Sequence, residues 1–107
     1  MKIALLTASY RGGGAEQVQV ILAKKFAELG HKVVLLSFEN TGELRQRIPS
    51  EVQTRSLRVP RVAAGIVPLI RFFRNERPDA TITAMRHVGS AAMLASQLAR
   101  YRGKMLL

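Results

Sequence analysis

The residues best suited to chemistry form one short string near the start of the chain, Arg11-Gly12-Gly13-Gly14-Ala15-Glu16. Three successive glycines fit neither a strand nor a helix interior, and they suit a loop in which the main chain turns tightly. A ligand can approach the backbone where side chains are missing, and the N–H groups of a following helix start can hold an anion. A plain tight turn is the alternative, because glycine is also a common loop residue.

A second candidate lies in the segment Met85-Arg86-His87-Val88-Gly89-Ser90, which we expect to form a loop. A histidine gains and loses protons near neutral pH, so His87 can orient or deprotonate a hydroxyl group. Arg86 and Arg11 can each bind a phosphate or an anionic substrate. The plainer interpretation of His87 is a loop histidine bonded to its neighbours, because the sequence identifies no partner carboxylate. His31 precedes a predicted strand, at the opposite edge, and we interpret it as structural.

The first half of the chain predicts the elements that position the glycine string. Residues 2–7 are an apolar run typical of a buried parallel strand. Apolar residues then recur at helical spacing from 15 to 29, before Gly30 ends the helix. Residues 33–38 form the next strand and complete a right-handed βαβ unit. The predicted inner face of the helix consists of Ala15, Val18, Ile21, Leu22, Phe26 and Leu29, and the outer face of Glu16, Gln17, Gln19, Lys24 and Glu28.

The second half continues the alternation of strands and helices. The polar segment 39–49 predicts a loop with a helical turn near 43–47, and the alternating residues 52–57 predict a strand nearer a sheet edge. The later elements are a helix with Ile66, Leu69, Ile70 and Phe73 on its apolar face, a strand at 80–84, a helix at 91–100 capped by Gly89-Ser90, and an apolar run at 104–107.

This pattern predicts the α/β class, with an open parallel Rossmann-like sheet of the doubly wound type and helices on both faces. We expect residues 1–107 to form one domain, truncated at about the fifth strand, at the front of a longer protein. Ligands in such sheets bind beyond the carboxyl ends of the strands. The candidate loops are therefore 8–15, 38–44, 58–62 and 84–90.

Composition excludes several classes of protein. The 107 residues carry a net charge of +10, and 48% of them are hydrophobic, which is too apolar for a disordered chain. The absence of cysteine removes disulfides and thiolate metal sites, and two histidines cannot build a His-rich site. We therefore expect no metal, and we expect no cofactor because the glycine string departs from the dinucleotide-binding pattern. No run approaches the ~20 apolar residues of a membrane span, and no leader pattern precedes the first strand, so we expect a cytoplasmic protein.

The charge is concentrated in one half, since residues 1–44 carry +1 and residues 45–107 carry +9. Such asymmetry often marks a surface that meets an anionic partner. The sequence contains no RNA-binding aromatic string or zinc module, and we expect no specific nucleic acid. Arg71 and Arg74 flank apolar residues that include Phe72, which lies off the main apolar stripe. This pattern predicts an interfacial helix on an anionic membrane, and the alternative is a core helix with a solvated arginine face.

A dinucleotide site is one alternative for the glycine string. Gly12 and Gly14 open the G-x-G-x-x-G pattern, and Glu39 follows the second strand, where a ribose-binding acid is expected. However, Gln17 stands at the third glycine position, and Glu16 places a carboxylate where a pyrophosphate would lie. The phosphate-binding pattern G-x-x-x-x-G-K-[ST] is absent.

The order of four short strings resembles the N-terminal domain of family 4 (group 1) glycosyltransferases. These strings are the start Lys2-Ile3-Ala4-Leu5-Leu6, the loop Gly12-Gly13-Gly14-Ala15-Glu16, the segment Leu29-Gly30-His31-Lys32-Val33, and Arg77-Pro78-Asp79 ahead of a strand. The resemblance covers most of the chain. It implies a GT-B enzyme, in which two Rossmann-like domains face each other across a cleft.

The resemblance also implies roles for the candidate residues. Gly13 and Gly14 are expected near the donor diphosphate, with Glu16 at the helix start, and the loop containing Arg86 and His87 is expected to line the acceptor side. The partners implied are a nucleotide-sugar, a glycan or lipid-linked acceptor of cell-envelope polysaccharide synthesis, the C-terminal donor domain, and the inner face of the membrane. The expected reaction is a retaining sugar transfer, which residues 1–107 alone cannot catalyse.

Two other functional classes remain open at this point. One is a stand-alone flavodoxin-like module that binds a ligand or a partner. The other is the dinucleotide-binding domain of an oxidoreductase.

Overall fold

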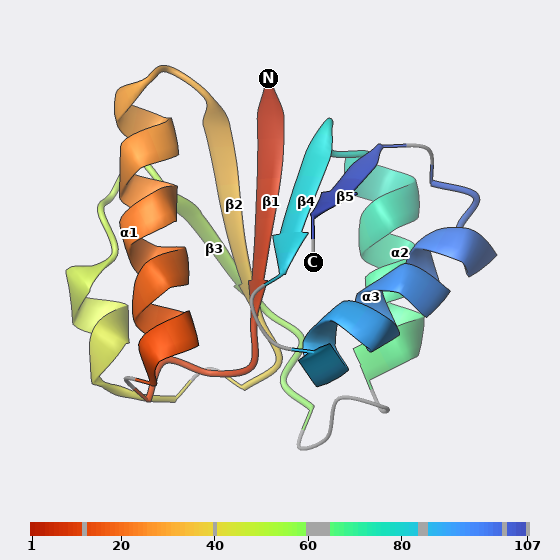
Figure 1. Cartoon of the computed structure of the whole chain (residues 1–107), viewed down its shortest axis with the longest axis horizontal. Coiled ribbons are helices and arrows are strands. Elements are labelled where there is room, and N and C mark those ends of the chain that lie inside the picture. Colours follow the sequence, from red (N-terminus) through yellow and green to blue (C-terminus); the bar gives the residue numbers. More distant parts are fainter. Residues whose placement is uncertain (12, 40, 60–64, 84–85, 102, 107) are drawn as a thin grey trace.

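The computed structural model describes residues 1–11, 13–39, 41–59, 65–83, 86–101 and 103–106. Strands and helices alternate along these residues (Figure 1). The elements are β1 (Lys2–Thr7), α1 (Gly14–Glu28), β2 (Lys32–Ser37), the 3-10 helix η1 (Glu43–Arg47), β3 (Gln53–Ser56), α2 (Ile66–Glu76), β4 (Ala80–Thr83), α3 (Arg86–Leu98) and β5 (Lys104–Leu106).

The five strands form one sheet in the order β3-β2-β1-β4-β5, and every neighbouring pair is parallel. β1 is therefore the central strand. Lys2 lies opposite Lys32 of β2, and Ile3 lies opposite Ala80 of β4. The predicted open parallel α/β sheet is confirmed.

The helices divide between the two faces of the sheet, as Figure 1 shows. α1 and η1 cover one face, where Ile3 and Leu5 of β1 join the core beneath α1. α2 and α3 cover the other face, where Ala4 and Leu6 pack into a second core. Alternate residues of β1 thus pack into opposite cores. Both faces of the strand are buried, which explains why its sequence is a continuous apolar run.

The predicted inner face of α1 is correct only in part, since Leu22 and Phe26 pack against the core as predicted. Val18, Ile21 and Leu29 are 50%, 59% and 72% exposed, whereas Glu16, Gln19, Val20 and Ala23 are buried. The physical reason is that Glu16 and Gln19 find hydrogen-bond partners inside the protein, so that their burial leaves few polar atoms unpaired. Small Val20 and Ala23 complete the buried face.

The predicted loop at 85–90 and the Gly89-Ser90 cap are also wrong. α3 begins at Arg86, so that Gly89 lies inside the helix and is buried. The residues that follow on the buried side of α3 are small, and they allow a helix to approach its neighbours closely. They are Ala91, Ala92, Ala95, Ser96 and Ala99.

Phe72 does not form a spare apolar surface on α2. Its side chain is 6% exposed and packs edge-on against the ring of Phe73, with the centroids 5.6 Å apart. α2 packs against both the sheet and α3, and a helix with two neighbours buries a wide apolar arc. Val67, which is 60% exposed, is the large apolar side chain that α2 presents to solvent in the described structure.

Candidate functional site

The carboxyl ends of β1 and β4 define the place where a ligand is expected in this sheet. α1 follows β1 on one face, and α3 follows β4 on the other, so the connections diverge between these two strands. A crevice at this switch point is the usual ligand site of an open α/β sheet. The structure thereby brings the glycine string and the start of α3 to the same edge.

Glu16 organises the glycine loop from inside. One carboxylate oxygen, Oε2, accepts hydrogen bonds from the Ser9 amide at 2.9 Å and the Ser9 hydroxyl at 2.5 Å. The other oxygen, Oε1, accepts from the Gly13 amide at 3.1 Å, as in one half of a capping box. Glu16 is 8% exposed. The structure therefore gives this carboxylate a positioning role, and its direct contact with substrate stays a prediction.

Gly13 and Gly14 differ in what they require of a side chain. Gly13 caps α1 with ordinary extended angles, φ −62° and ψ 158°, and a Cβ there would lie 3.2 Å from Glu16 Oε1. A Cβ on Gly14 would meet nothing within 4 Å. Both glycines are exposed, and the missing Gly14 side chain leaves the first turn of α1 open. Gly12, also predicted to bind substrate, lies outside the described residues.

Arg11 connects the glycine loop to the loop that follows β2. Its Nη2 lies 2.7 Å from Glu39 Oε2, although 67% of the arginine side chain is exposed. The Tyr10 amide donates to the Thr41 carbonyl at 2.7 Å, and the Leu44 amide donates to the Tyr10 carbonyl at 3.0 Å. The two loops therefore form one unit, and Arg11 keeps an exposed cation at its surface.

Gly42 is the residue that permits this union of loops, although the sequence around it predicts no such role. Its φ is +122°, which strains any L side chain, and a Cβ would fall on the main chain of Tyr10. A glycine in a polar loop carries little specific signal in a single sequence. The close approach appears only when both loops are seen together.

Gln19 links β1 to β4 at the switch point. Its Nε2 donates to the Leu6 carbonyl at 2.7 Å and to the Ile82 carbonyl at 3.0 Å, and the residue is 1% exposed. Its Oε1 and the buried Thr83 hydroxyl have no hydrogen-bond partner among the described residues. Gln19 was placed on the outer face of the helix, because a polar residue in an amphipathic pattern usually faces solvent.

Arg86 and His87 occupy the first two positions of α3, at the same edge as the glycine loop. Their side chains lie outside the described part of the structure, so their roles stay predictions. His31 is half-buried at the opposite edge, where its ring meets Phe26 edge-on at 6.2 Å. The structural interpretation of His31 fits this position. Among the described residues, no three potential metal ligands cluster.

Comparisons with known proteins connect this architecture to one family. The sequence model of the family described as Glycosyltransferase Family 4 matches residues 12–106. A search of curated proteins finds no match.

Three solved structures have the same fold at low sequence identity. The apo form of the lipopolysaccharide outer core galactosyltransferase WaaB is 15% identical, with a TM-score of 0.69, and the match covers 98% of this chain and 32% of that chain. MurG of Acinetobacter baumannii is 17% identical, with a TM-score of 0.65, and the match covers 97% of this chain and 34% of that chain. Anabaena Alr3699/HepE in complex with UDP and glucose is 21% identical, with a TM-score of 0.66, and the match covers 98% of this chain and 28% of that chain. The chain spans about a third of the length of each.

Proposed function

The chain belongs to glycosyltransferase family 4, and on this premise we propose that it is the acceptor-side domain of a GT-B enzyme that transfers a sugar from a nucleotide-sugar to an acceptor. The observation that carries the proposal is the Glu16-anchored glycine loop at the carboxyl end of β1. The family match favours this function over the flavodoxin-like module and the oxidoreductase. The proposed reaction is retaining, and a C-terminal donor domain completes the enzyme.

The glycine loop explains how such a domain would serve sugar transfer. The first N–H groups of a helix have no partner within the helix, and they favour a negative charge placed before them. Gly14 leaves these groups of α1 open to a ligand, while Glu16 is turned inward onto Ser9 and Gly13. We propose that the helix start and the exposed Arg11 stabilise the charge that develops on the departing diphosphate.

The start of α3 supplies the acceptor side in this proposal. Arg86 would bind an anionic group of the acceptor, and His87 would orient or deprotonate the acceptor hydroxyl. Both residues follow β4 at the ligand edge of the sheet, which supports their assignment. The proposed donor needs no metal or other cofactor from the described residues.

The test of the function uses the protein as its gene encodes it, with a panel of nucleotide-sugars and lipid-linked or polysaccharide acceptors. The expected result is acceptor-dependent release of nucleoside diphosphate with one donor. The Gly14→Val variant should lower kcat about a hundred-fold, as loss of a main-chain charge-stabilising site does elsewhere, without lowering Tm. Gly14 is a better position than Gly13, where a new side chain would press on Glu16.

Val18→Ala, on the exposed side of the same helix, is the matched control and should retain full activity. A protein that releases no diphosphate with any donor contradicts the proposed function. A Gly14→Val variant with normal kcat removes the glycine loop from the mechanism.

A further inference from the structure

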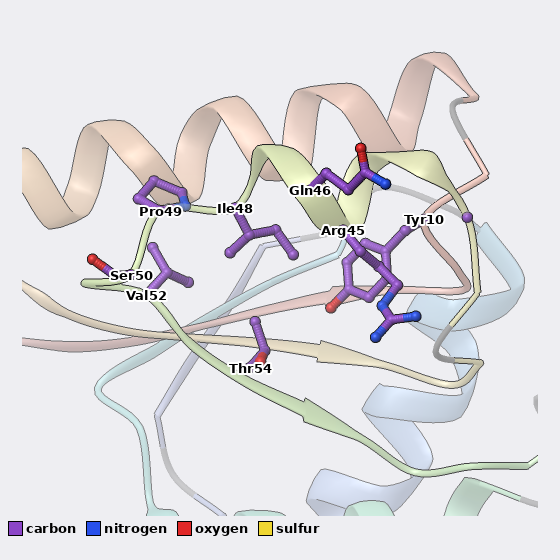
Figure 2. Close-up of a pocket in the computed structure, with 9 residues that line it drawn as sticks. Tyr10, Arg45, Gln46, Ile48, Pro49, Ser50, Val52 and Thr54 are labelled. Atoms are coloured by element: carbon purple, nitrogen blue, oxygen red, sulfur yellow. The ribbon is translucent and has the colours of Figure 1, made fainter.

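A pocket of about 550 Å³ lies on the α1 side of the sheet, beside β3. Its lining comes from the loop after β1, from η1, and from the segment that leads into β3 (Figure 2). Its lining includes Tyr10, Gly42, Arg45, Ile48, Val52 and Thr54. This volume is within the range of small-molecule sites in proteins. The pocket lies along the β3 flank of the domain, and Tyr10 and Gly42 connect it to the glycine loop of the proposed transfer site.

The inner end of the pocket contains a polar group without a partner. Tyr10 is 1% exposed, and its hydroxyl has no hydrogen-bond partner among the described residues. Figure 2 shows this hydroxyl pointing from the ring toward the side of the pocket where Thr54 of β3 lies. The fully buried Ser37 hydroxyl lies within reach of the Tyr10 hydroxyl, yet no hydrogen bond of ordinary geometry joins the two. Buried hydroxyls are normally paired, so an unpaired one beside a pocket points to a missing partner.

Arg45 supplies a cation at the same end. It is exposed and forms no ion pair with a described residue. Burial raises the pKa of the Tyr10 phenol, and the nearby Arg45 charge acts in the opposite direction. Neither Glu43 nor Glu51, the acidic residues nearest in sequence, is among the described residues that line the pocket. The Arg45 charge is therefore available to an anionic ligand.

The remaining lining is part apolar and part polar. Ile48 and Val52 provide a small hydrocarbon wall, and Thr54 of β3 lies across the pocket from them. An apolar wall faces the C–H groups of a sugar ring, while side-chain hydroxyls bind its oxygens. A purely hydrophobic ligand would leave the polar groups of this lining unpaired.

We propose that this pocket binds a small sugar that carries one carboxylate or phosphate. Arg45 binds the anionic group, and the hydroxyls of Tyr10 and Thr54 bond to the sugar. The exposed Arg45 side chain can turn toward the ligand on the nanosecond scale of free rotamers, and the proposal requires that this movement give the ligand access to the buried Tyr10 hydroxyl. The proposal concerns binding alone and does not depend on the transferase activity.

The experiment measures binding by NMR titration and calorimetry in 150 mM salt, where weak surface attraction to a basic protein is screened. The probes are glucose 6-phosphate, glucuronate, glucose and inorganic phosphate. We expect one of the two anionic sugars to bind at least ten-fold more tightly than glucose and than inorganic phosphate, with shifts at the amides of Gly42 and Val52. The sugar that binds identifies the anionic group as phosphate or carboxylate.

Three variants locate the site. Arg45→Gln should weaken the anionic sugar at least ten-fold, whereas Arg47→Gln, on the same 3-10 helix but outside the lining, should change affinity less than two-fold. Tyr10→Phe should weaken binding several-fold without lowering Tm, because the hydroxyl it removes has no partner. Absence of binding by every probe overturns the proposal. Equal binding of inorganic phosphate, or equal losses in the Arg45 and Arg47 variants, also overturns it.

Discussion

The structure shows a role for Glu16 that the sequence does not predict. The sequence predicts that this carboxylate contacts substrate, which stays a prediction, and the structure shows its oxygens accepting hydrogen bonds from Ser9 and Gly13. Three hydrogen bonds therefore fix the position of this buried side chain. The residue thus fixes the shape of the loop, and the exposed glycines are left to face a ligand.

Gly42 provides a stability test at the same scale. Gly42→Ala should lower the free energy of unfolding by about 3 kcal/mol, since the new side chain adds backbone strain and overlaps the Tyr10 main chain. Urea denaturation of the 107-residue chain measures this change. Gly14→Ala, at a position with open space and no positive φ, is the control and should leave stability within about 0.5 kcal/mol. An unchanged midpoint for Gly42→Ala would contradict the observed packing of the two loops.

Gln19 allows a test of the link between β1 and β4. Gln19→Leu should cost about 2 kcal/mol, because the Leu6 and Ile82 carbonyls lose a shared donor. Hydrogen exchange should also accelerate selectively at the ends of β1 and β4. The control is Gln97→Leu, at an exposed position on α3. If exchange rises equally across the whole sheet, Gln19 contributes only general stability.

At the level of elements, periodicity predicted the positions of the helices and strands, but it predicted only part of the buried face of α1. The strand and helix positions follow from apolar runs and from glycine and proline boundaries, which are local signals. The buried face of α1 depends on the partners of Glu16 and Gln19, which are main-chain groups of β1, β4 and the first loop. Such partners become visible only in three dimensions. For the same reason the sequence located the glycine loop but not Gly42, Gln19 or the Tyr10 pocket.

The end of α2 is joined to two strands through Glu76. Its carboxylate lies 2.5 Å from Lys2 Nζ of β1 and also pairs with Arg55 of β3, and 14% of its side chain is exposed. The hydrogen bond from Lys2 lowers the pKa of Glu76, and the Arg55 charge acts in the same direction. A lowered pKa in the folded state means that the stabilisation is complete above the unfolded value near 4.3 and is lost as the pH falls further.

Glu76→Gln should therefore reduce the free energy of unfolding by about 1 kcal/mol at pH 7. The difference from the unmodified chain should shrink as the pH falls below about 4, because the unfolded chain takes up a proton at Glu76 before the folded chain does. Urea unfolding at pH 7, 5 and 3.5 measures this trend. Glu28→Gln is the control, because the Lys25–Glu28 pair is 3.8 Å apart and largely exposed. A deficit that stays constant down to pH 3.5 would show that the ion pairs do not cause it.

At the scale of the whole molecule, the positive charge of residues 45–107 and the exposed arginines of α2 favour an interaction with an anionic membrane. We propose a cytoplasmic protein that associates peripherally with the inner membrane face. Arg71 and Arg74 are exposed, whereas burial of Phe72 removes most of the expected apolar contribution. No helix in the described ranges is long and apolar enough to span a bilayer. Because Phe72 is buried while Arg71 and Arg74 are exposed, we expect the interaction to depend on charge.

Sedimentation with vesicles tests this proposal. The protein should bind vesicles rich in anionic lipid at low salt, with the affinity falling steeply by 0.5 M salt, and it should not bind neutral vesicles. Replacing Arg71 and Arg74 together by Gln should reduce the bound fraction several-fold. Lys24 and Lys25 of α1, on the other face of the sheet, provide the charge-matched control pair. No binding at low salt, or equal losses in the two pairs, would remove α2 from membrane recognition.

The central position of β1 has a consequence for how the chain folds. β1 pairs with β2 within the first βαβ unit, but it pairs with β4 across most of the chain, from Ile3 to Ala80. Closing so long a loop costs conformational entropy, and this cost is offset only after the contacts between β1 and β4 have formed. We therefore expect the βαβ unit of β1, α1 and β2 to form early. The pairing of β4 with the free edge of β1 should then limit the folding rate. During that interval the edge of β1 is open to the wrong strand, and the first half of the chain is where misfolding would begin.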